Sequence, residues 1–154
     1  MTDISAEEQL AAFIAKYTPE IGEQVCSVLE TMRSRLTGAI ELVYDNYNAL
    51  AIGFGPTERV SEVIFSIAVY PRWVSLFFFQ AHGLADPEKL LKGSGKMARH
   101  IVLTDPEALN GPSIRALMDQ ALKKAIKPLD PSQPHRIVIK SISAKQRPRR
   151  PATA

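Results

Sequence analysis

This sequence of 154 residues has too little cysteine for an internal disulfide and no long apolar run. Its single cysteine, Cys26, has no partner for an internal disulfide, and no apolar run is long enough to cross a bilayer. No secretory signal is recognisable, so we expect a cytoplasmic protein without a membrane partner. The length and the 45% share of hydrophobic residues are typical of one soluble globular domain.

Recognisable metal ligands and catalytic groups are also scarce. The three histidines, His82, His100 and His135, lie far apart and have no cysteine ligands beside them, so zinc is not indicated. Cys26 adjoins Val25 in a predicted helix and is interpreted as a small packed or half-buried side chain, with no base placed near it by the sequence. No two residues can be given complementary acid–base roles, so we expect a non-enzymatic protein with no cofactor and no metal.

The hydrophobic pattern changes its period along the chain. Helical spacing after the capping box Ser5–Glu8, and again after Thr18–Pro19, predicts two N-terminal helices, of which the second stops at Gly38. From Ala39 onward the pattern favours strands, and Pro112 opens a third helix with a clear apolar stripe. Strands are expected at 39–44, 49–54, 62–70, 73–80, 99–104 and 136–142, with a short helix over 86–91 and a helical turn after Asp105–Pro106.

The order of these elements predicts the fold class. A connector as short as Pro71–Arg72 links only antiparallel neighbours, and no helices separate successive strands as a parallel α/β fold requires. We therefore expect an α+β fold, with a mainly antiparallel sheet of five to six strands packed by two N-terminal helices and one long C-terminal helix. The strands at 62–70 and 73–80 are almost wholly apolar, so we place them centrally with both faces covered, and 136–142 at an edge.

Charge is unevenly distributed along the chain. Acidic residues dominate positions 1–30, whereas basic residues gather after Leu129. The C-terminal basic residues are Arg136, Lys140, Lys145, Arg147, Arg149 and Arg150. The polar, Pro/Arg-rich composition after Ser143 predicts one domain over 1–143 and a disordered basic tail over 144–154. Such a tail is either simply solvated or contacts a nucleic-acid backbone, and the solvated tail is favoured.

Two neighbouring segments are the best candidates for a binding site. The turn around Pro71 displays aromatic and basic side chains, and the segment 92–96 places lysines among glycines. This segment is not a Walker loop, because its glycine spacing is wrong and Met97 takes the hydroxyl position. The predicted ligand-binding residues are Tyr70, Arg72, Trp73, Lys92, Ser94, Lys96 and Arg99.

Each of these features also has an ordinary structural interpretation. Glycine amides and cations in the 92–96 loop could hold one anion beside an aromatic wall, but surface lysines in an exposed loop give the same pattern. Trp73 could stack on a ligand, or it could close the end of the core, as most lone tryptophans do. Carboxylates on the N-terminal helices could attract iron, but a solvated helix face accounts for them as well.

Several segments together resemble the YdhG-like domains of unknown function. The segments are Ala49–Gly55, Ser66–Val74, Asp86–Pro87, Leu90–Lys96 and Arg99–His100, within a resemblance that covers about residues 20–127. The resemblance implies a compact α+β domain with an antiparallel sheet, in which a lysine-containing loop leads into a basic strand residue, here Arg99. The wider group is spoken of together with frataxin-like iron chaperones, and some distant relatives are suspected of binding DNA.

The leading functional expectation is a binding module for a small anion or for an acidic group of a partner protein. Two alternatives stay open. One is a frataxin-like iron chaperone that uses N-terminal carboxylates. The other is a nucleic-acid accessory protein that acts through its basic C-terminal arm. The sequence leaves the oligomeric state open.

Overall fold

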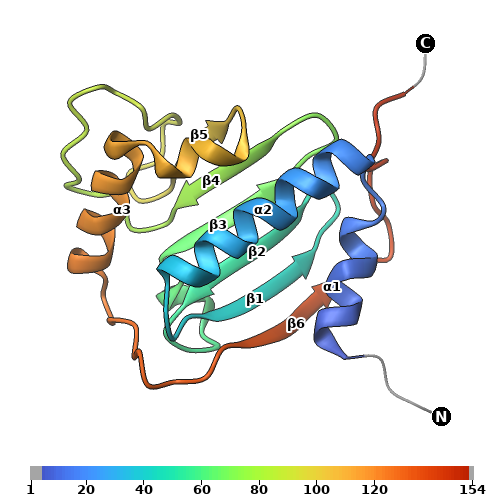
Figure 1. Cartoon of the computed structure of the whole chain (residues 1–154), viewed down its shortest axis with the longest axis horizontal. Helices are drawn as coiled ribbons and strands as arrows, with labels where there is room; N and C mark the ends of the chain where they lie inside the picture. The colour runs from blue at the N-terminus through green and yellow to red at the C-terminus, as the bar shows by residue number, and fades with distance from the viewer. Residues whose placement is uncertain (1–4, 153–154) are drawn as a thin grey trace.

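A six-stranded sheet carries helices on one side in the computed structural model, which describes residues 5–152 (Figure 1). The helices are α1 (Ala6–Ile14), α2 (Pro19–Arg35) and α3 (Pro112–Lys124). The strands are β1 (Ile40–Asp45), β2 (Leu50–Gly55), β3 (Phe65–Val69), β4 (Val74–Phe78), β5 (Arg99–Leu103) and β6 (Arg136–Ile142), and the 3₁₀ turns are η1 (Val60–Glu62) and η2 (Pro106–Asn110). The expected α+β class is confirmed.

The sheet is mixed but largely antiparallel. Its strand order is β5-β4-β3-β2-β1-β6, and every pairing is antiparallel except the parallel one between β1 and β6. The hairpin around Pro71 forms as predicted, because the Tyr70 amide donates to the Trp73 carbonyl at 2.9 Å. Strands β3 and β4 lie inside the sheet and β6 lies at its edge, also as predicted.

Side-chain caps start both N-terminal helices, as the sequence predicts. The Ser5 hydroxyl accepts a hydrogen bond from the Glu8 amide at 3.1 Å, and the Thr18 hydroxyl accepts one from the Ile21 amide at 3.4 Å. After α2 the chain turns toward the sheet at Gly38, whose φ of +87° suits glycine. A side chain there would also collide with the carbonyl of the segment that passes over it.

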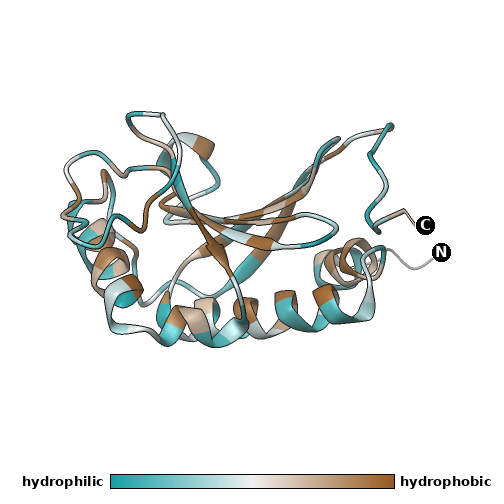
Figure 2. Cartoon of the chain, turned by 90° about the horizontal axis from the view of Figure 1, so that it is seen from above, coloured by the Kyte–Doolittle hydropathy of each residue, from teal (hydrophilic) through white to brown (hydrophobic). Residues whose placement is uncertain are grey.

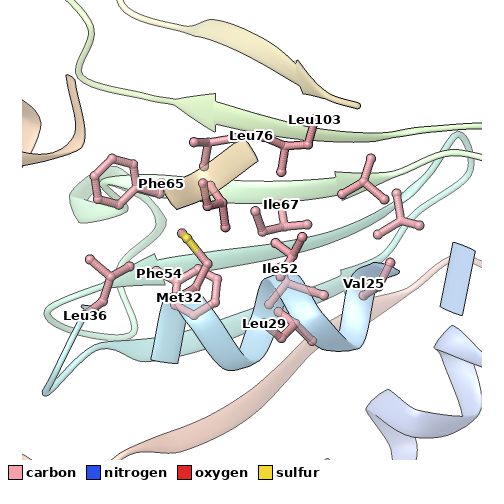
Figure 3. Close-up of a cluster of buried hydrophobic side chains, with 14 of the residues drawn as sticks. Val25, Leu29, Met32, Leu36, Ile52, Phe54, Phe65, Ile67, Leu76 and Leu103 are labelled. Atoms are coloured by element: carbon pink, nitrogen blue, oxygen red, sulfur yellow. The ribbon is translucent and has the colours of Figure 1, made fainter. Parts of the chain in front are cut away.

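The main core lies between α2 and one face of the sheet (Figure 3). Val25, Leu29 and Met32 of α2 point toward Ile52 and Ile67 of the sheet. Each of these five residues is at most 3% exposed. Full burial of such a side chain contributes roughly 1.5–3 kcal/mol, so this layer is the principal apolar contribution to stability.

The segment 86–91 differs from its predicted helix. It forms turns, because Lys89 takes a left-handed φ of +55° that no α-helix contains. The Asp86 carboxylate accepts hydrogen bonds from the amides of Leu90 and Leu91, both at 2.9 Å. The aspartate therefore caps a loop and not a helix.

Element lengths also differ in two places. The C-terminal helix α3 has 13 residues and is shorter than α2, which has 17, so the longest helix is N-terminal. The strand expected over 62–70 begins only at Phe65, because η1 takes up its first residue.

The second face of the sheet bears none of the three α-helices (Figure 2). Figure 2 shows the three helices along one side of the twisted sheet and connecting loops on the other. Val63, just after η1, packs over Gly53 and against Ile40 and Leu42. All five residues of β3 are buried, and β4 is buried except at half-buried Phe77, so the expectation that these strands are covered on both faces largely holds. We call the rest of this helix-free side of β2, β3 and β4 the open face.

The C-terminal segment packs against the turn between β1 and β2, which corrects the expectation of a disordered tail over 144–154. Arg149 is only 5% exposed, and its guanidinium donates to the Asp45 carboxylate at 2.9 Å and to the Asn46 carbonyl. The Arg147 amide donates to the Tyr47 carbonyl at 2.8 Å. Residues 153–154 lie outside the described range. A basic composition suggested solvation, but a buried carboxylate fixes this arginine.

Asp45 joins three parts of the chain. One oxygen of its buried carboxylate accepts a hydrogen bond from Lys16, just after α1, at 2.8 Å. The other oxygen accepts one from Arg149. Burial alone raises the pKa of Asp45, but the hydrogen bonds from Lys16 and Arg149 outweigh it, so the pKa lies below its usual value. The end of β1, the end of α1 and the C-terminal segment are thereby held together.

Replacing Arg149 with methionine should lower the free energy of unfolding by about 3 kcal/mol, because it removes one partner of a buried ion pair. Urea unfolding measures this change. The matched control is Arg147→Met, which removes an exposed arginine of the same segment and should change stability by less than about 0.5 kcal/mol. Equal losses in the two variants would show that Arg149 is not an anchor.

Asp45 should also make the fold acid-sensitive. Because its folded pKa is depressed, the carboxylate contributes stability that is present above the unfolded pKa of about 3.9 and is lost as pH falls through the folded pKa. Asp45→Asn should be less stable at neutral pH and should lose less stability between about pH 5 and pH 2, in urea unfolding at each pH. The exposed Asp119→Asn should follow the unmodified chain. An Asp45→Asn curve parallel to that of the unmodified chain contradicts this assignment.

Candidate functional site

The seven predicted site residues do not meet in one patch. Tyr70 and Trp73 lie in the β3–β4 turn, where β4 starts, whereas Arg99 pairs with Phe78, where β4 ends. At about 3.3–3.4 Å per residue, the five steps from Trp73 to Phe78 span roughly 17 Å. The expectation that the turn and the lysine loop converge is therefore wrong, because strand β4 itself holds them apart.

The turn presents its aromatic residues to solvent. The rings of Tyr70 and Trp73 stack with centroids 4.7 Å apart and planes 20° apart. Trp73 is 42% exposed, so it does not close the core as a lone tryptophan usually does. Arg72 is also exposed and lines a separate hollow beside Pro19 and Glu20 at the start of α2. The turn thus divides its aromatic and basic side chains between two surfaces.

The lysine loop brings two of the predicted cations together. Lys96 and Arg99 line a cavity of about 470 Å³, with Leu84 and Leu91 among its apolar walls. Arg99 donates through Nε to the Gly95 carbonyl, which ties the strand residue to the loop. Within the described residues neither cation forms an ion pair with a carboxylate.

The other two loop residues lie outside this cavity lining. Lys92 forms a backbone bridge with His100, in which each amide donates to the other's carbonyl at 2.7 and 3.0 Å. Ser94 is exposed in the loop. Asp86 does line the cavity, but its carboxylate already accepts two backbone amides. The cavity therefore contains two cations without a carboxylate partner, and one carboxylate that is already hydrogen-bonded to backbone amides.

The open face holds a groove that sequence reasoning missed. Its volume is about 530 Å³. Ala51 and Ala68, which are cross-strand partners, form its floor together with Ser66. Phe77, the cross-strand partner of Ser66, lines one side with Phe79. The remaining lining residues are Asn46, Tyr47, Asn48, Ala49, Tyr70 and Ser143.

The sequence does carry a signal for this groove. In the segments 50–55 and 65–69, large apolar side chains alternate with Ala, Gly or Ser. Successive side chains of a strand face opposite sides, so the large ones enter the main core and the small ones leave the open face hollow. Treating both faces as equally apolar overlooks this alternation.

Exposed apolar side chains gather around the groove. Tyr47 and Phe79 line it and are 50% and 38% exposed, and Trp73 stacks on the lining residue Tyr70. Clusters of exposed apolar side chains are typical of interaction sites, whereas scattered ones are ordinary. The open face is therefore a second candidate site, independent of the lysine loop.

The contact between exposed His135 and the buried Glu41 carboxylate has a structural role. His135 contacts the fully buried Glu41 carboxylate, which also receives Arg33 at 2.6 and 2.9 Å. Hydrogen bonding to Glu41 raises the pKa of Arg33 above its usual value, so the guanidinium stays protonated. No group of three or more His, Cys, Asp or Glu residues within 5–152 could hold a metal ion. None of the helices in that range is long and apolar enough for a membrane span.

No family model matches the chain, and no curated protein or solved structure matches it. The resemblance to YdhG-like domains therefore stays a prediction from the segments given above.

Proposed function

We propose that this chain is a non-enzymatic binding module that holds a small anion, or an acidic group of a partner, in the cavity beside Lys96 and Arg99. The observation that carries the proposal is that these two cations, alone among the seven predicted residues, line the same cavity. Cations that share a cavity and lack carboxylate partners leave their charge available to a ligand.

The cavity walls define the preferred ligand further. Charge-assisted hydrogen bonds contribute about 1.5–3 kcal/mol each, so two cations suffice for a measurable affinity. Leu84 and Leu91 add apolar surface, which favours an acid with a short hydrocarbon body over a bare ion. The aromatic wall of Tyr70 and Trp73 takes no part, because it lies at the other end of β4.

The two alternative functions gain less support. A nucleic-acid arm requires free C-terminal arginines, but Arg149 is buried on Asp45 and Arg150 donates to the carbonyls of Ala15 and Lys16 at 3.4 and 3.1 Å. The iron-chaperone alternative stays a prediction from the resemblance, and no contact among the described residues adds to it.

The double variant Lys96→Ala/Arg99→Ala tests the proposal with succinate and inorganic phosphate as probes. Loss of both cations should weaken the binding of at least one probe by tenfold or more in isothermal titration calorimetry, because each contact contributes more than about 1.4 kcal/mol. The melting temperature should change by less than about 3 °C, since surface substitutions rarely cost more than 0.5 kcal/mol.

The matched control is Arg72→Ala/Arg147→Ala, which removes the same charge from two exposed residues outside the cavity. It should leave probe binding unchanged. Equal weakening in both double variants would mean that only net charge attracts the probes. A large fall in melting temperature on loss of Lys96 and Arg99 would make them structural residues.

A further inference from the structure

The groove on the open face is separate from the cavity of the proposed function. Its lining shares no residue with the cavity beside Lys96 and Arg99. A volume of about 530 Å³ lies within the range typical of small-molecule sites. The groove is therefore considered as a separate binding site, with its own ligand.

The hydroxyl of Ser66 is available to a ligand in the groove. Ser66 is only 4% exposed and lines the groove, yet its hydroxyl makes no hydrogen bond within residues 5–152. Its cross-strand neighbours are Gly53 and Phe77, which offer no polar side-chain atom. The hydroxyl can donate to or accept from a polar group of a ligand in the groove.

The walls of the groove suit a flat ring system. The Phe77 ring is backed by His100, with centroids 5.1 Å apart, and the Tyr70 ring is backed by Trp73. A side chain that is stacked from behind loses little further freedom when a ligand covers its other face. The floor of Ala51 and Ala68 lets an aromatic plane approach the sheet closely.

The lining also decides the charge of the ligand. It contains amides and hydroxyls but no Asp, Glu, Lys or Arg side chain. Arg147 lies over the Tyr47 ring at 5.7 Å but is not part of the lining. An ionised group in the groove would lose hydration without gaining a charged partner, whereas the amides of Asn46 and Asn48 can pair with neutral polar atoms.

We infer that the open face binds a flat, uncharged aromatic molecule. Its rings lie on Ala51 and Ala68 with Phe77 and Tyr70 as side walls, and one hydrogen-bonding group reaches Ser66. This site is a second function of the chain, and it holds whether or not the cavity beside Lys96 and Arg99 binds an acid.

Two probes that share one aromatic body test the inference: N-phenyl-1-naphthylamine, which is neutral, and 8-anilinonaphthalene-1-sulfonate, which is charged. The neutral probe should bind one per chain and at least tenfold more tightly than the sulfonate, by probe fluorescence. It should also change the emission of Trp73, the only tryptophan, through the Tyr70 stack. Equal affinity for the two probes, or no saturable binding of the neutral one, overturns the inference.

Substitutions in the groove floor and at Ser66 show where the probe binds. Ala68→Leu should fill the groove and weaken the neutral probe at least tenfold, and Ala51→Leu repeats the test if the first variant folds poorly. Ser66→Ala should weaken it several-fold. The control Ile126→Ser removes an exposed apolar side chain outside the lining and should have no effect. Unchanged binding in every floor variant overturns the inference.

The same variants distinguish this site from the other cavity and from self-association. Ala68→Leu should leave succinate and phosphate binding as it is in the unmodified chain. The two binding sites can therefore be tested independently of each other. Sedimentation of the chain, at the concentrations used for the titrations, reports whether the open face is a contact between two copies. A dimer that Ala68→Leu dissociates would overturn the small-molecule assignment.

Discussion

Packing of α2 against a single face of the sheet is the constraint on which the rest of the structure depends. Val25, Leu29 and Met32 meet the large side chains of β2 and β3, and this layer contains the principal apolar burial of the domain. Because large and small side chains alternate in those strands, the same packing that fills one face leaves the other hollow. The open face is thus a consequence of how the core is built.

A buried ion pair determines where this hollow ends. Asp45 lies at the end of β1, and through Arg149 it holds the C-terminal segment against the β1–β2 turn. Tyr47 in that turn and Ser143 in that segment both line the groove. The stability of the Asp45 contact and the shape of the open face are therefore physically connected, although neither charge lies in the groove lining itself.

Much of the fold could be predicted from the sequence because its signals are local. The caps at Ser5 and Thr18, the Pro71 hairpin and the edge position of β6 each follow from a few neighbouring residues. The role of Arg149 could not, since its partner lies 104 positions earlier and composition alone favours solvation. The separation of the turn from the lysine loop was predictable in principle, because an extended β4 must hold its two ends apart. The groove was accessible as well, through the alternation in β2 and β3.

Amide chemical-shift mapping of the labelled chain with N-phenyl-1-naphthylamine shows whether the hollow left by one-sided core packing is the binding groove. We expect the perturbed amides to cluster at Ala51, Ser66 and Ala68 and to extend to Phe77. No change is expected at Gly22 and Cys26, which line a hollow of about 710 Å³ between α1 and α2. Perturbations centred on that hollow, with β2 and β3 unchanged, would show that the open face is not the binding groove.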